Sequence, residues 1–163
     1  MGGLIGGLYK LSTIILDEIK VNGTMHCEST TLTYKYHASS LLGMETSVST
    51  INTTNVNVSM NMSGNQIISG FVGLVYNYSV FNMINSKSEN TVESAAYSSA
   101  CIGYSIDCDI NLQNSTIIAA INTTASNATG FGISLNRSTI NATNCSVSGY
   151  IYTAGNYAVS FFG

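Results

Sequence analysis

The sequence contains no proline, no tryptophan and few charged residues. Proline removes a hydrogen bond from a β-sheet, so its absence permits a long, regular stack of strands. Only 8% of the 163 residues are charged, and the formal net charge is −3. An electrostatic nucleic-acid binder needs a clustered basic face, so the composition excludes that class of protein.

Long apolar runs are absent as well. No stretch of 18 apolar residues occurs, so no segment is expected to cross a membrane as a helix. The opening residues 1–7 lack the basic region of a signal peptide. We therefore expect any secretion signal to lie outside this stretch or to have been removed.

A five-residue phrase recurs four times at spacings of 30, 29 and 30 residues. It begins with isoleucine or phenylalanine and carries asparagine at its second and fifth positions. The four copies are Ile51–Asn55, Phe81–Asn85, Ile110–Asn114 and Ile140–Asn144. Periods of 20–50 residues are typical of solenoids and arrays.

A glycine anchor keeps the same step, and the residue before it is large and apolar. These apolar residues are Ile5, Leu42, Val72, Ile102, Phe131 and Phe162. A further apolar column follows the asparagine phrase at Val21, Val58, Ile117 and Val147, with Ser88 as its exception. Alternation with a period of two predicts strands with one buried face.

These columns predict an all-β parallel β-solenoid, or β-helix, of about five coils of ~30 residues with three short strands in each coil. The chain is expected to form one domain, 1–163. The first coil spans about residues 2–38 and includes an insertion, coils two to five span about 39–158, and a final strand covers 159–163.

Stacked coils would place the repeated asparagines in two ladders, in which each amide bonds to the amides above and below it. We expect these ladders to satisfy buried polar turns. One ladder consists of Asn52, Asn82, Asn111 and Asn141, and the other of Asn55, Asn85, Asn114 and Asn144. A row of sugar-binding amides is the functional alternative.

Eleven Asn-X-Ser/Thr sequons occur, which suggests a secreted, glycan-coated surface. The alternative is that asparagine ladders beside Ser/Thr-rich strands produce sequons as a by-product. Ladder positions should be poor glycan acceptors. The outward candidates are Asn57, Asn61, Asn77, Asn122 and Asn136.

Three other groups of residues could carry chemistry. Asp107 and Asp109 flank Cys108 and could form a carboxylate pair, but a solvated turn is the favoured interpretation. The segment 26–28 with His37 matches no standard zinc spacing. The four cysteines could pair, with Cys101 and Cys108 geometrically possible, or could serve as small buried hydrophobes. We expect no catalytic residue, cofactor or metal.

The anchors resemble the repeats of β-helical surface proteins. Residues 2–6 (Gly-Gly-Leu-Ile-Gly) and Phe81–Asn85 are similar to the GLUG-type repeat and to the repeats of polymorphic outer membrane proteins. The resemblance implies a cell-surface or secreted β-helix that serves in adhesion or as structural material, and it implies no enzymatic activity.

The expected function is therefore a secreted or cell-surface structural protein that assembles head to tail with copies of itself into a filament or coat. The ends of the solenoid, with Leu4 and Ile5 at one and Phe161 and Phe162 at the other, are expected to form the contacts. The alternative is a segment of an adhesin stalk that binds host or matrix carbohydrate.

Overall fold

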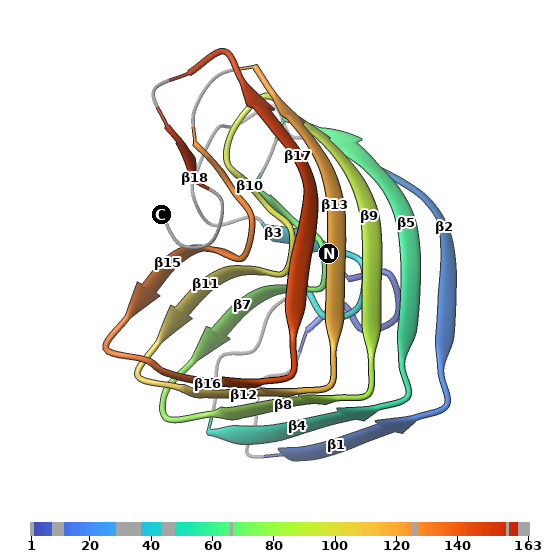
Figure 1. Ribbon diagram of the computed structural model, residues 1–163, viewed down its shortest axis with the longest axis vertical. Coiled ribbons are helices and arrows are strands. Elements are labelled where there is room, and N and C mark those ends of the chain that lie inside the picture. Colours follow the sequence, from blue (N-terminus) through green and yellow to red (C-terminus); the bar gives the residue numbers. More distant parts are fainter. Residues whose placement is uncertain are drawn as a thin grey trace.

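The computed structural model describes residues 2–7, 12–28, 37–43, 48–65, 67–124, 127–155 and 157–159. All strand pairs in this part of the chain are parallel, and none of its residues is helical. Successive turns of the chain stack on one another, as Figure 1 shows. The predicted parallel β-solenoid is confirmed.

The turns build four sheets, which we name here with their strands in spatial order. The Asn sheet contains β1 (Ser12–Asp17), β4 (Ser49–Thr54), β8 (Val80–Ile84), β12 (Asp109–Gln113) and β16 (Thr139–Thr143). The long sheet contains β2 (Lys20–Cys27), β5 (Asn57–Gly64), β9 (Lys87–Ser94), β13 (Thr116–Thr123) and β17 (Ser146–Thr153).

The two remaining sheets consist of shorter strands. The corner sheet contains β3 (His37–Ser39), β6 (Ile67–Ser69), β10 (Ser98–Ser99), β14 (Ala128–Thr129) and β18 (Ala158–Val159). The short sheet contains β7 (Val72–Tyr76), β11 (Ile102–Ile106) and β15 (Gly132–Asn136).

Each complete turn thus contributes four strands, where the sequence predicted three. The additional strand is the one in the corner sheet, which is separate from the strand after it because the chain bends at residues such as Gly70 and Phe71 between β6 and β7. The corner-sheet strands have only two or three residues, too few for an alternating pattern to reveal them.

The repeat fixes the register of the Asn sheet. Ile14, Ile51, Phe81, Ile110 and Ile140 lie opposite one another on consecutive strands. In the long sheet Val21, Val58, Ser88, Ile117 and Val147 also form one column. Both columns agree with the sequence alignment.

The glycine anchor fails in one turn. Ile102 pairs with Gly132, so Phe131 shares its column with Cys101 and not with Ile102. A Cβ on Gly132 would lie 2.9 Å from Leu135, whose side chain occupies that space. The glycine series places a step of 29 residues between Gly103 and Gly132, but the short sheet has no such step there, because Ile102 pairs with Gly132. The 29-residue step lies instead in the Asn sheet, where Val80 pairs with Asp109.

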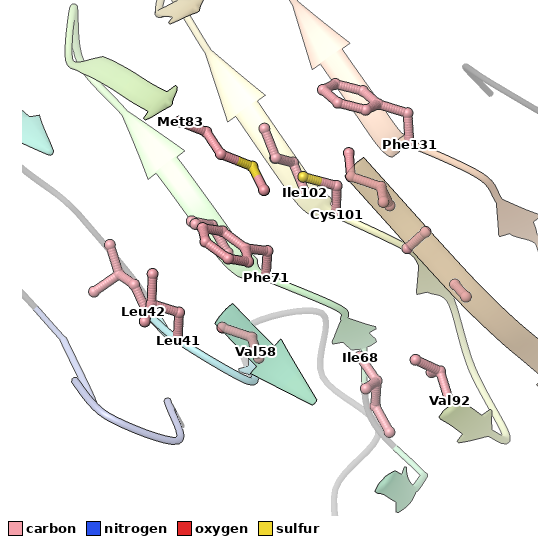
Figure 2. Close-up of a cluster of buried hydrophobic side chains, with 14 of the residues drawn as sticks. Leu41, Leu42, Val58, Ile68, Phe71, Met83, Val92, Cys101, Ile102 and Phe131 are labelled. Atoms are coloured by element: carbon pink, nitrogen blue, oxygen red, sulfur yellow. The ribbon is translucent and has the colours of Figure 1, made fainter. Parts of the chain in front are cut away.

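The core is a continuous column of apolar side chains between the sheets (Figure 2). Phe71, Phe81 and Phe131 are fully buried, and the ring centroids of Phe71 and Phe81 lie 5.9 Å apart. Burial of this kind supplies the main stabilisation, about 25 cal/mol for each Å² of apolar surface removed from water.

In every turn, the corner between the Asn sheet and the long sheet contains a residue with a left-handed backbone conformation. Asn55, Asn85, Asn114 and Asn144 adopt φ angles of 48–55°, and Glu18 adopts 55° at the equivalent place. Asparagine tolerates this left-handed conformation better than most residues with a side chain. At the fifth position of the phrase asparagine therefore serves mainly to form the turn, and its hydrogen bonds in the ladder are secondary.

Candidate functional site

The first asparagine ladder is present, but it lies on the outer face of the Asn sheet. Asn82 Nδ2 donates to Asn52 Oδ1 over 2.6 Å, Asn111 to Asn82 over 2.8 Å, and Asn141 to Asn111 over 2.9 Å. These side chains are half-buried or exposed, because their neighbours in the strand, such as Phe81 and Met83 beside Asn82, occupy the inward positions. The expectation that this ladder satisfies buried turns is wrong.

The second ladder is looser and incomplete. Asn114 donates to Asn85 over 3.1 Å and Asn144 donates to Asn114 over 3.3 Å. Asn55 donates instead to the Asp17 carboxylate, over 3.4 Å. All of these turn asparagines are exposed, so water can also reach their amides.

The five candidate glycan acceptors all have exposed side chains. Asn57, Asn61 and Asn122 lie on the outer face of the long sheet, where exposed and buried residues alternate along each strand. Asn77 and Asn136 lie at the corner after β7 and at the end of β15. A bulky group on any of them would project into solvent.

Of the two carboxylates near Cys108, that of Asp107 forms an ion pair with Arg137. Asp107 receives two hydrogen bonds of 2.6 Å from Arg137, which lies one turn further along the solenoid. These hydrogen bonds hold the pKa of Asp107 below its ordinary value, with the charge of Arg137 adding to the effect. A general acid needs the opposite shift. The 30-residue spacing of Asp107 and Arg137 equals the repeat, so applying the repeat to charged residues would have identified this pair.

His26, the first residue of the segment considered for metal binding, contacts other side chains. Its Nδ1 lies 2.8 Å from Ser63 Oγ and its Nε2 lies 3.1 Å from Glu28. Within the described residues no group of three potential ligands occurs. The side chain of His37 lies outside that part of the chain.

None of the four cysteines forms a disulfide in the structure. Burial raises the pKa of Cys27 and of Cys101, which keeps both thiols protonated. Cys108 and Cys145 stand at corners and donate to carbonyl oxygens two residues earlier, over 3.0 and 3.2 Å. Serines perform the same task at equivalent corners, as in Ser86 to Ile84 over 2.8 Å. The second interpretation, small buried side chains, therefore fits Cys27, Cys101 and Cys108, whereas Cys145 is half-buried.

The ends of the solenoid differ from its middle. At the C-terminal end a recess of about 190 Å³ opens into the core beneath the last turn. Core residues such as Leu112, Ile117 and Phe131 line it together with Val147. At the other end Leu4 is 47% exposed and Ile5 is half-buried, whereas Phe161 and Phe162 lie outside the described residues.

Sequence reasoning did not identify a group of exposed tyrosines in the last turn. Tyr150, Tyr152 and Tyr157 are 60–62% exposed, and the first two share the outer face of β17. Their spacing of two residues within a strand was the available signal.

Comparison with known proteins gives no relative. No family model, no curated protein and no solved structure matches the chain. Within the residues that the structure describes, no helix is long and apolar enough to cross a membrane. The functional argument therefore depends on the geometry alone.

Proposed function

We propose that this chain is a structural β-solenoid of the cell surface or extracellular space, which stacks end to end with copies of itself. The observation that carries the proposal is the exposure of core positions in the end turns. Ile51 and Ile110 are 1% and 0% exposed, whereas Ile14 and Ile140, in the same column, are only half-buried. A further turn at either end would bury them.

The backbone edges support the same conclusion. Among the described strands, β1 and β2 form one edge of the Asn and long sheets, and β16 and β17 form the other. Unpaired strand edges are templates for pairing with another chain. The contact between opposite ends of two copies is heterologous and does not close, so it produces a filament.

The two edges are protected unequally. Asp17, Glu18 and Lys20 place charges in the N-terminal turn, whereas β16 and β17 contain no charged residue. Charges at an edge oppose aggregation. We therefore expect the C-terminal edge to pair with another chain more readily than the N-terminal edge does.

An in-register stack requires one local rearrangement. Gly2 pairs with Ser39 and Val159 pairs with Thr129, and both belong to the column that continues through the corner sheet. The Gly2–Gly7 segment of one copy and β18 of the next would therefore compete for one position. A second copy can therefore continue all of the columns only if one of the two segments moves aside.

Glycans would suit such an assembly. The five exposed acceptor candidates project away from the solenoid axis, so sugars there would coat the sides without covering the ends. Glycopeptide mapping of the protein from its natural source tests this. Sugar on Asn52 or Asn141, with the five exposed positions bare, would contradict the proposed arrangement.

A second candidate function is a stalk segment that binds carbohydrate, and the exposed tyrosines of the last turn favour it. Tyr152 lies opposite Asn122 on the neighbouring strand, so an aromatic ring and an amide share one outer face. Tyrosine offers a flat apolar ring with a polar tip, which suits a sugar. Binding to a glycan array that is lost in Tyr150→Ala and Tyr152→Ala would favour this function.

Assembly is tested by sedimentation and electron microscopy at rising protein concentration. Val147→Lys puts a charge into an inward position of the C-terminal edge and should abolish association. Gln113→Lys puts the same charge on the outward face of β12, which is not an edge strand, and should leave association intact. Circular dichroism shows whether each variant retains its sheet. A wild-type protein that stays monomeric at high concentration would remove the proposal.

A further inference from the structure

The amide ladders have a direction. In both of them every hydrogen bond between two asparagines runs from the amide nitrogen of one turn to the amide oxygen of the preceding turn, as from Asn141 to Asn111 and from Asn144 to Asn114. Each ladder therefore presents a donor toward the N-terminal end and an acceptor toward the C-terminal end. Within the described residues nothing donates to Asn141 Oδ1 or to Asn144 Oδ1.

The C-terminal edge consequently offers two amide acceptors beside the open backbone of β16. They lie three residues apart, in the two columns that interior turns fill with asparagine. A strand added to this edge would complete both ladders if it carried amide donors at those two columns. An interior turn of this protein meets that condition.

The N-terminal turn does not meet it. In β1 the column of Asn52 is occupied by Ile15, which is 71% exposed, and directly after β1 Glu18 takes the place of Asn55, one residue beyond the pairing of Asp17 with Thr54. An alkyl side chain and a carboxylate donate no hydrogen bond. In a head-to-tail contact Ile15 would face the oxygen of Asn141, and the Glu18 carboxylate would face the oxygen of Asn144.

We infer that Ile15 and Glu18 weaken the contact between the N-terminal turn of one copy and the C-terminal edge of another. This inference rests on the proposed end-to-end assembly. The junction keeps the backbone pairing and the apolar columns but loses both amide ladders. It is therefore weaker than the contact between two turns of one chain, and the stack comes apart at its junctions.

The double variant Ile15→Asn with Glu18→Asn tests the inference, because it restores both donors. Sedimentation equilibrium should show self-association stronger than that of the wild type by on the order of tenfold, as two added hydrogen bonds would give. Asparagine accepts the φ of 55° at position 18, and position 15 is exposed, so the variant should fold.

A matched control changes the same turn outside the ladder columns. Thr13→Asn with Glu28→Gln also adds two amides and removes one carboxylate, but neither residue lies in a ladder column. Its association should equal that of the wild type. Asn141→Ala with Asn144→Ala, added to the restored variant, should cancel the gain, as in a double-mutant cycle.

Each result has one meaning. If the wild type associates and the restored variant associates no more tightly, the inference is wrong and the end-to-end proposal stands. An equal gain in the matched control also overturns the inference, because charge or solubility would then explain it. If the wild type and all variants remain monomeric at high concentration, both the inference and the proposed assembly fail.

Discussion

Asn90 Nδ2 lies 2.6 Å from the carbonyl oxygen of Gly70 and donates to it inside the solenoid. The same amide lies 2.7 Å from Ser88 Oγ, and its oxygen accepts from the Met60 backbone nitrogen over 3.0 Å. Asn90 is 4% exposed. One buried side chain thus joins the bend before β7 to two neighbouring strands of the long sheet, and it explains why Ser88 stands in an apolar column.

Replacing Asn90 with leucine should lower the free energy of unfolding by about 2 kcal/mol, because the buried Met60 N–H loses its acceptor on Asn90 and the Gly70 carbonyl, to which Ser40 also donates, loses one of its donors. Denaturant titration measures the change. The control is Glu93→Gln, on the exposed face of the same strand, which should have little effect. Equal stability of the two variants would mean that the Asn90 contacts contribute nothing.

Two kinds of buried serine should respond in opposite ways to alanine substitution. Ser99 is fully buried, and its hydroxyl has no hydrogen-bond partner, so Ser99→Ala should be neutral or stabilising by up to about 1 kcal/mol. Ser86 donates to Ile84 and accepts from the Val56 nitrogen, so Ser86→Ala should cost about 1–3 kcal/mol. Thermal unfolding of both variants measures this contrast, and a costly Ser99→Ala would contradict it.

Glu18→Asn should stabilise the single chain as well as the junction. Glutamate at a φ of 55° occupies a conformation that asparagine adopts more readily, so the gain should be roughly 0.5–1 kcal/mol. Unfolding measured at low protein concentration separates this effect from association. Glu28→Gln, which removes a charge elsewhere in the same turn, should not reproduce it.

The ion pair of Asp107 and Arg137 should make stability depend on pH. Because the pKa of Asp107 is lower in the folded state, its contribution is present above the ordinary pKa of aspartate and is lost as the pH falls through the folded value. Arg137→Gln should therefore be less stable than the wild type at neutral pH, and the difference should shrink in acid. An unchanged difference across that range would show that the pair does not contribute.

The sequence predicted the parts of this fold that repeat and missed the parts that do not. Isoleucine columns and asparagine phrases recur because every turn meets the same neighbours, so their period alone gave the register. The contact between Asn90 and Gly70 crosses the core within one turn, and no neighbouring turn repeats it. Periodicity carries no information about such a contact.

The positions of the ladder asparagines could also be predicted from the sequence, but the face on which they lie and the direction of their hydrogen bonds could not. The ladder positions follow from spacing, but the face on which Asn82 lies depends on which side of the strand points inward, and in β8 both sides carry apolar residues, Phe81 and Met83 inward and Val80 and Ile84 outward. The direction of the ladders is set by side-chain rotamers, which spacing does not determine. The mismatch at Ile15 and Glu18 became visible only with the strand register.

The contrast between fully buried interior turns and half-buried end turns also has a kinetic consequence. Each turn contacts only its neighbours, so an end turn opens without disturbing the rest, and the chain frays inward from both ends. Amide hydrogen exchange should therefore form a gradient, fastest in β1, β2, β16 and β17 and slowest in β8 and β9. Stacking of a second copy would flatten that gradient at the occupied end, which makes exchange a direct reporter of which end is covered.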